Sequence, residues 1–508
     1  MDFTKFRENP KQYISNLAQV TDQTPDLGIK DQLDNVFNSN PELINTIPIV
    51  STMGHLNMTM PGTLVRLRCV LIKNAYSEFI FHRVHHEGRF YTAIISEEAP
   101  ENCQLPDMQS MVARNVYLFS SVPSFSDWMI TEMTPEHEPA NPNLNIEEVQ
   151  KVNTRLMFEE AFQTQVKMLH AISEKPGIVY DVIGFLSEPE PLRVNPLGFD
   201  IPEDDFYSTI PVFVGLTSCE VKSLYMPVLN SPEPSLPEIR AQLLNILAAV
   251  FEPVQAEILL LWMLGSVKAR TPEIIRGLFS LNFFGATPEI ANTLTHLFKF
   301  LFTSSMSIPM NCNTLNTMPL NPSVENNEFH STPFSVPLDT RLIIDETGLD
   351  VGQFNEIGVH NINILKKIID EQTVDYLFEK AYYNINVSYP VLVLSKCKSL
   401  LETQVCFPIG NVKSANLSLD PTLLILIRKY LENVKNLDYV MSDEDSNFVQ
   451  EAITSILKAD KEIHPIELHI LMIINTLNCI SLGAPAITKE IWDHSVMIFN
   501  ALRQHKRQ

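Results

Sequence analysis

At 508 residues the chain is too long for one hydrophobic core, and its length predicts about three domains. Its 60 acidic and 37 basic residues give a net charge of −23, so extended binding to a phosphate backbone is not expected. Seven cysteines are scattered and never spaced as CxxC, which predicts reduced thiols and no cysteine-based zinc site. Because the chain begins with charged residues and its longest apolar runs fall short of a membrane span, we expect a soluble, non-secreted protein without membrane contact.

Shifts in composition divide the chain into five segments, and the predicted fold class is multidomain, α/β plus β. The expected segments are short N-terminal helices (1–50), an OB-like β-barrel module with an internal linker near 131–165 (51–195), a linker rich in proline and acids (196–235), an α/β core with a largely parallel sheet (236–410), and a helical C-terminal domain (411–508). The first segment carries apolar residues at helical intervals, divided by Pro10 and Pro25.

The barrel is predicted from strand patterns between residues 62 and 187. Residues 62–96 predict a β-meander that turns at Glu87 and Gly88, and residues 115–121 and 177–187 predict further strands. Several short strands of this kind are typical of a small Greek-key barrel of OB type. Such a barrel can bind single-stranded nucleic acid. The basic residues that would serve this alternative are Arg66, Arg68, Lys73, Arg83 and Arg89.

Beyond the linker the chain alternates between helix and strand patterns, which predicts a parallel sheet. Pro253 divides two apolar helices, and Thr271 is expected to begin another helix. Residues 303–339 are poor in charge and predict an irregular excursion that contains one strand. Exposed Met and Phe side chains within 303–334 are candidate partner contacts. The other expected strands are 278–285, 341–346, 374–378 and 385–395, with helices from Thr287 and over 362–371.

The strand, loop and helix around Gly285 have the order of a phosphate-binding loop but lack its working residues. Counting GxxxxGK[ST] from Gly285 places Ile290, Ala291 and Asn292 where Gly, Lys and Ser or Thr are needed. Without the Lys there is no point charge for the phosphates, and without the second Gly the amides cannot form a close anion nest. Thr287 is expected to cap the helix instead. We therefore predict a degenerate phosphate loop at Gly285 and Thr287.

Asp345 and Glu346 end an apolar run, as do the acids that hold metal and water in nucleoside triphosphatases. A weak ATPase that uses these two acids is thus a second alternative. The other interpretation is a central strand that ends in solvated acids. Further along, Asn361 is interpreted as the cap of a helix entered after Gly358, and neither Asn361 nor His360 is given a catalytic role. No cofactor, metal or catalytic residue is expected.

Four short motifs occur in order along the core, and two weaker ones precede them. They are IDET (344–347), GVHN (358–361), VDY (374–376) and NINV followed by SLL (384–401), preceded by VPSFSDW (122–128) and DVIGFLS (181–187). Together they resemble the mini-chromosome maintenance complex-binding protein family, a partner of the hexameric replicative helicase. The residues of these motifs that stand at the degenerate site are Asp345, Glu346, Gly358, His360 and Asn361.

The resemblance implies a non-enzymatic, nuclear chaperone or scaffold that binds helicase subunits. It further implies a role in DNA replication, through helicase assembly or removal from chromatin, and in sister-chromatid cohesion. Barrel, degenerate core and helical tail also follow the order of a helicase subunit, so the core is expected to be AAA-like, by analogy of fold alone. We expect the acidic linker and the core to form the partner surface, and direct nucleic-acid binding is not expected.

Overall fold

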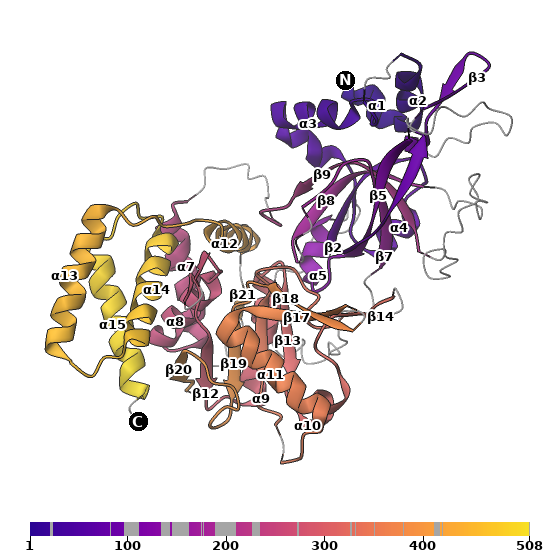
Figure 1. Cartoon of the computed structure of the whole chain (residues 1–508). Helices are drawn as coiled ribbons and strands as arrows, with labels where there is room; N and C mark the ends of the chain where they lie inside the picture. Colours follow the sequence, from indigo (N-terminus) through magenta and orange to yellow (C-terminus); the bar gives the residue numbers. More distant parts are fainter. Residues whose placement is uncertain are drawn as a thin grey trace.

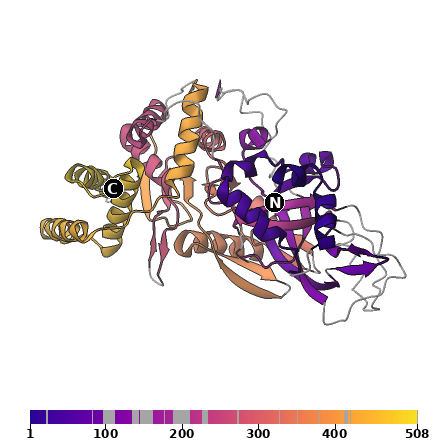
Figure 2. The same ribbon diagram turned by 90° about the horizontal axis from the view of Figure 1, so that it is seen from above.

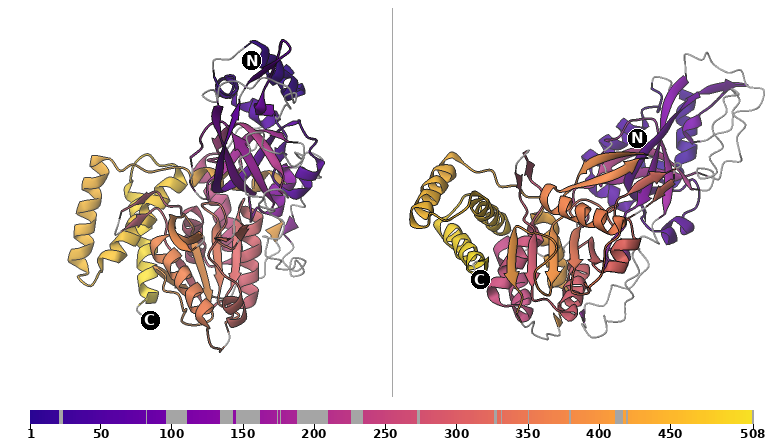
Figure 3. Two further views of the ribbon diagram at one scale, coloured as in Figure 1. Left: turned by 45° about the vertical axis from the view of Figure 1, so that its right-hand side comes forward. Right: turned by 60° about the horizontal axis from the view of Figure 1, so that its bottom comes forward.

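In the computed structural model, three modules follow one another along the chain (Figure 1). A β-barrel with its helices forms one end, an α/β core lies in the middle, and C-terminal helices flank the core on another side (Figures 1 and 3). Seen from above, the barrel and the helices α13–α15 lie at opposite ends of the molecule (Figure 2). The structure describes all residues except 21–23, 82, 96–110, 134–142, 145–161, 174, 176, 188–209, 226–233, 272–273, 326–327, 331, 350, 379, 411–416, 419 and 507–508.

The N-terminal segment is helical, as predicted. Its helices are α1 (Phe3–Glu8), α2 (Pro10–Val20), α3 (Ile29–Ser39) and the short 3-10 helix η1 (Pro41–Thr46). Their apolar residues, among them Phe6, Ile14 and Leu33, pack in one cluster with Ile183 and Val214 of the barrel wall. The segment is therefore held by burial against the outside of the barrel rather than by helix propensity alone.

Five strands of the barrel form a closed ring of pairings. Their order is β2 (Leu64–Phe81), β5 (Met111–Ser121), β7 (Gln163–Met168), β9 (Val212–Glu220) and β8 (Val179–Leu186), and β8 pairs again with β2. The short β1 (Ile49–Val50) adds to β2, followed by α4 (Met53–Met58). Alternate residues of β2, such as Leu67 and Cys69, point into the interior cluster with Tyr117 and Phe119. Whether this ring is of OB type stays a prediction.

The predicted meander over 62–96 is wrong. Residues 64–81 form the single long strand β2, which pairs with β8 along its first part and with β5 along its second. Register shifts between Leu71 and Lys73 and between Asn74 and Tyr76 mark two irregularities, which bend a strand so that it serves two neighbours. Only the predicted turn remains, because Glu87 and Gly88 join a small separate hairpin. That hairpin is β3 (Val84–His86) and β4 (Arg89–Tyr91), followed by η2 (Ala93–Ile95).

The predicted boundary of the barrel is also wrong. Strand β9 lies inside the segment predicted as a linker over 196–235, and it pairs with both β7 and β8. The Pro- and acid-rich sequence on either side of β9 outweighed its apolar run in the sequence pattern. The barrel thus ends near Glu220, and the following segment to Tyr225 packs on the barrel.

The core holds a five-stranded sheet in which all four pairings are parallel. The strand order is β13 (Ser305–Pro309), β16 (Arg341–Asp345), β19 (Val391–Ser395), β12 (Leu281–Phe284) and β20 (Val405–Pro408). Leu342 and Ile344 face one apolar cluster, while Ile343 faces the other. The covering helices are α7 (Leu236–Val250), α8 (Pro253–Leu264) and α9 (Pro288–Leu301) on the face of Ile343, and α11 (Glu356–Glu371) on the opposite face.

Three expectations for the core are corrected. The region after Thr271 is not a helix, because β10 (Ala269–Arg270) and β11 (Ile275–Arg276) form a small hairpin there. The excursion over 303–339 is more regular than the single expected strand, because β13 is the edge strand of the parallel sheet. It also contains α10 (Cys312–Thr317), β14 (Ser323–Glu325) and β15 (Glu328–His330). The strand predicted over 385–395 is two strands: its first residues belong to β18 (Ala381–Asn386), and its last residues form β19. Strand β18 pairs with β17 (Thr373–Phe378) in a second sheet, whose order is β15-β14-β17-β18.

The C-terminal domain is helical, as predicted, with α12 (Pro421–Val434), α13 (Asp443–Ala459), α14 (Pro465–Leu482) and α15 (Lys489–Lys506). A short pairing of β21 (Leu417–Ser418) with β6 (Asn143–Leu144) precedes it. By length and composition α14 could cross a membrane, contrary to our expectation from the apolar runs, and it is the only such helix in the described part of the chain. More than half of it, 56%, is buried, and it packs against α7, α8 and α15.

Candidate functional site

The turn where a phosphate loop would lie is occupied by the chain's own groups. Gly285 follows β12 with φ +82°, a value that suits glycine, and the next amide, of Ala286, donates to Ser395 O at 3.0 Å. Thr287 caps α9, as predicted, and its Oγ1 accepts from the Ile290 N–H at 3.4 Å. A hydrogen bond with Thr287 lowers the pKa of the Glu289 carboxyl, which places a negative charge at this helix start. An anion would meet a carboxylate there.

Asp345 is the last residue of strand β16 and Glu346 follows it, and both carboxylates are engaged by other groups of the chain. Asp345 Oδ1 accepts from the Thr347 N–H at 2.8 Å and from its hydroxyl at 2.6 Å. Glu346 is only 5% exposed, and its Oε1 accepts from Ser399 Oγ at 2.8 Å. Burial raises the pKa of the Glu346 carboxyl, although the bond from Ser399 and backbone amides of the next two residues oppose this. The interpretation of both residues as solvated acids is therefore wrong for Glu346. Its hydrogen bond from Ser399 connects the IDET motif to the SLL motif.

GVHN lies within α11 rather than at its start. Asn355 is the cap, since its Oδ1 accepts from the Gly358 N–H at 2.9 Å, so the interpretation of Asn361 as a cap is wrong. Asn361 is 1% exposed, and its amide bonds three backbone groups across the α10 region, at Leu315, Met318 and Leu320 (2.8–3.2 Å). A Cβ on Gly358 would stand 2.3 Å from Asn316 Oδ1. These two residues therefore fasten α10 to α11.

His360 is an exposed polar member of this motif. Its Nε2 lies 3.0 Å from Asn321 Nδ2, and its ring lies 6.2 Å from that of Tyr382 on β18. Neither contact brings a carboxylate or a thiol to the imidazole. In the described residues, no group of three or more His, Cys, Asp or Glu side chains could hold a metal ion.

VPSFSDW forms the joint between the barrel and the core. Ser124 Oγ and Ser304 Oγ lie 2.6 Å apart, and the backbones of Phe125 and Ser304 form an isolated bridge. The Ser126 N–H donates to Thr303 O at 2.9 Å. The sequence distinguishes this motif only by its resemblance, and no local pattern in it predicts its partners around residue 304.

Trp128, on α5 (Asp127–Met133), anchors the joint. Its indole Nε1–H donates to Lys299 O at 3.1 Å, and the Arg428 guanidinium lies 3.7 Å from a ring centroid of the indole. Tyr225 meets the indole edge-on at 5.1 Å. Nearby, Glu432 of α12 accepts from the Leu224 N–H at 2.7 Å and pairs with Lys435. Barrel, core and C-terminal helices thus meet at one buried polar junction.

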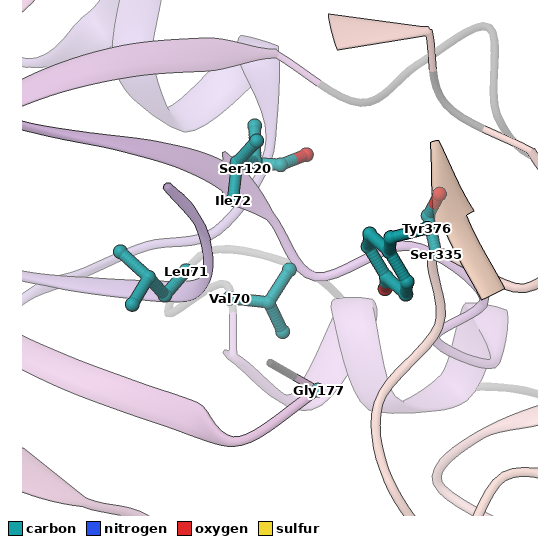
Figure 4. Close-up of a pocket in the computed structure, with 7 residues that line it drawn as sticks. All are labelled: Val70, Leu71, Ile72, Ser120, Gly177, Ser335 and Tyr376. Carbon is teal, nitrogen blue, oxygen red and sulfur yellow. The ribbon is translucent and has the colours of Figure 1, made fainter. Parts of the chain in front are cut away.

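A small cavity also lies between barrel and core (Figure 4). Val70, Leu71 and Ile72 of β2 line one side of it, and Tyr376 of β17 with Ser335 lines the other. Its seven lining residues are uncharged, and burial raises the pKa of the Tyr376 hydroxyl. The cavity offers apolar packing space but no charged group for catalysis.

Some of the residues that the sequence offered for partner contacts are buried. Of the five basic residues named for nucleic acid, Arg66 and Arg68 are buried, whereas the other three are half-buried or exposed, namely Lys73, Arg83 and Arg89. Arg68 donates twice to Asp181, both at 2.8 Å, and Arg66 Nη1 lies 3.4 Å from the same carboxylate. Both arginines are less than 10% exposed, which counts against their use by nucleic acid. Among the Met and Phe side chains that the structure describes in the excursion over 303–339, Met306, Met310 and Phe334 are buried and Met318 is half-buried.

Comparison with known proteins identifies the family of this chain. The family model for the mini-chromosome maintenance replisome factor matches residues 210–506, more than half of the chain. The chain belongs to this family. The match begins just before β9, so the replisome factor model spans the last barrel strand, the core and the C-terminal helices.

Curated relatives of this chain occur in animals and plants. Proteins named mini-chromosome maintenance complex-binding protein match from Mus musculus (29% identical over 296 residues, 54% of this chain and 44% of the relative), Drosophila melanogaster (27% over 273 residues, 51% and 45%) and Arabidopsis thaliana (27% over 291 residues, 54% and 49%). The matched part amounts to about half the length of these relatives.

Proposed function

We propose that this chain is a non-enzymatic partner of the mini-chromosome maintenance helicase that acts in DNA replication by binding helicase subunits. The observation that carries the proposal is the family match over 210–506, together with the names of the relatives, which describe binding to this complex. We further propose that it works in the nucleus, in helicase assembly or removal from chromatin, and contributes to sister-chromatid cohesion.

The state of the degenerate site supports binding over hydrolysis. Thr287 and Glu289 occupy the helix start, and Asp345 and Glu346 are engaged by Thr347 and Ser399. A phosphate would have to displace these internal bonds without a lysine to compensate for them. We also propose that the barrel is of OB type and the core AAA-like, which would give the chain the module order of a helicase subunit.

The segment that follows β16 supports a protein-binding role for this edge of the core. Three apolar side chains are exposed there, Val351 fully, Ile357 at 45% and Val359 at 50%. Leu400, whose amide bonds the Glu346 carboxylate, is 42% exposed. Protein interfaces typically have an apolar centre that is surrounded by a polar rim, and exposed aliphatic side chains can supply such a centre. We propose that helicase subunits contact this segment.

The test is a binding measurement on each purified helicase subunit, with Ile357→Glu and Val359→Glu as variants. Glu is tolerated in the first turn of α11, so folding should not change. Burying a carboxylate in an apolar contact should weaken binding at least about tenfold, equivalent to about 1.4 kcal/mol. Val440→Glu is the matched control, because Val440 is 83% exposed on the loop between α12 and α13. It should change Kd less than about twofold.

Two results separate the parts of this proposal. If no helicase subunit binds the wild-type chain, the proposed function is wrong. If subunits bind but both α11 variants match Val440→Glu, the function stands and the contact surface lies elsewhere. Saturable ATP binding in equilibrium dialysis would instead support the ATPase alternative.

A further inference from the structure

Strand β18 (Ala381–Asn386) is an exposed sheet edge. It ends the sheet β15-β14-β17-β18, and no strand of the described chain pairs with its outer side. Five of its six residues are exposed, including Tyr382 at 58% and Tyr383 at 57%. An edge that presents unpaired backbone groups and large side chains is a template for another strand.

The direction of its free backbone groups follows from two hydrogen bonds. Leu377 of β17 donates its N–H to Pro322 O, on the side of β14 and away from its partner Tyr382. Val387, just after β18, donates to Gln372 O. In an antiparallel pair, residues alternate between facing the partner strand and facing outward. The residues of β18 whose N–H and C=O face outward are therefore Tyr382, Asn384 and Asn386.

This edge lacks the features by which proteins usually block strand addition. Residues 381–386 contain no proline and no charged side chain, and their register with β17 runs through six pairs without a bulge. The flanking Lys380 lies in the turn before the strand. Nothing within β18 itself opposes the addition of a further strand.

The charges indicate what kind of strand fits. The chain carries a net charge of −23, yet all six side chains of β18 are neutral. The acid paired with it, Asp375, is neutralised by Lys367 at 2.8 Å and accepts a hydrogen bond from Asn384. In a twofold antiparallel pair each side chain opposes one from an identical strand, so a charged strand would meet its own charge. This strand avoids that repulsion.

We propose that β18 pairs with β18 of a second copy of this chain, which joins the two four-stranded sheets into one. A twofold axis through Tyr383 or Asn384 keeps the two faces of the sheet matched. With the axis at Tyr383, the two Tyr383 rings oppose each other and Tyr382 opposes Asn384 of the other copy. The proposal does not depend on the helicase partner proposed above.

Sedimentation velocity on the full chain, from about 1 to about 200 µM, tests the pairing, because an edge-strand interface is small and dissociates on dilution. Hydrogen exchange at both concentrations locates it. We expect the mass to rise towards two chains, and exchange of the outward amides of β18 to slow at least about fivefold at high concentration. Asn384→Lys should weaken association at least about tenfold, because it places a charge in the paired edge. Asn363→Lys, an exposed position on α11, adds the same charge away from the edge and should leave both readouts unchanged.

Thermal melts of the two variants show whether either one unfolds. A chain that stays monomeric over the whole range overturns the proposal. So does a dimer in which exchange in 381–386 is unchanged, since its interface lies elsewhere. Protection that arises only when another protein is added would assign the edge to a strand of that protein instead of a second copy.

Discussion

Replacing Trp128 with alanine should uncouple the barrel from the core. The indole is 5% exposed and contacts three parts of the chain, through Lys299 O, the Arg428 guanidinium and the Tyr225 ring. Its removal leaves a cavity at the junction and an unpaired carbonyl at Lys299. Because VPSFSDW supplies many of the polar contacts between these modules, the effect should extend beyond local packing.

The expected cost in unfolding free energy is about 4 kcal/mol, since truncation of a buried Trp typically costs about 3–5 kcal/mol. The cation–π contact with Arg428, about 1–2 kcal/mol, and the indole hydrogen bond, about 1 kcal/mol, are part of that total. Trp128→Phe keeps a ring beneath Arg428 and loses the indole donor. It should cost about 1–2 kcal/mol.

Urea denaturation followed by circular dichroism measures the cost, and hydrogen exchange in β2 and β5 reports on the coupling. Trp492→Ala is the matched control, because Trp492 is also 5% exposed but packs within the C-terminal helices, edge-on to Phe448. Trp128→Ala should speed exchange in the barrel strands, whereas Trp492→Ala should speed it only in α13 to α15. A loss below about 1 kcal/mol, or equal exchange in the two variants, would refute the reasoning.

Two further substitutions test the core motifs. Gly358→Ala should cost about 1–3 kcal/mol, because the added methyl would stand 2.3 Å from Asn316 Oδ1; urea titration measures it, and an unchanged midpoint would contradict the close contact. Glu346→Gln tests the buried carboxyl of Glu346. Because the pKa of this carboxyl is raised, the folded protein binds its proton more tightly than the unfolded protein does. This contribution to the stability of the wild type is present below the ordinary pKa of 4.5 and is lost as the pH rises through the pKa of the folded state. With increasing pH, the unfolding free energy of Glu346→Gln should therefore rise relative to that of the wild type. A pH-independent difference in urea midpoints would show that Glu346 does not titrate as argued.

Features with short-range causes were predicted correctly. Thr287 caps α9 because a threonine before Pro288 satisfies a free amide within three residues, and the strand over 341–345 follows from an unbroken apolar run. The degenerate phosphate loop stays a prediction, which rests on the residues that follow Gly285. The helical C-terminal domain follows from its apolar periodicity and caps.

The roles of the motif residues were decided by contacts between distant segments. The glycine at 358 predicts a cap at Asn361, whereas the Asn361 amide binds carbonyls more than forty residues earlier. Glu346 meets Ser399, and Trp128 meets Arg428, across 53 and 300 positions of sequence. No local pattern records such a partner, because hydrogen bonding and burial depend on where the folded chain brings each group.

By itself, the sequence determined the α/β alternation, the capped helices and a turn without a phosphate cradle, because these depend on neighbouring residues. Only the tertiary structure decided that β9 completes the barrel, that VPSFSDW is a joint, and that β18 is an open edge. Strand β9 shows the reason: its flanks are typical of a linker, and it becomes a strand because β7 and β8 leave a gap between them that its backbone fills.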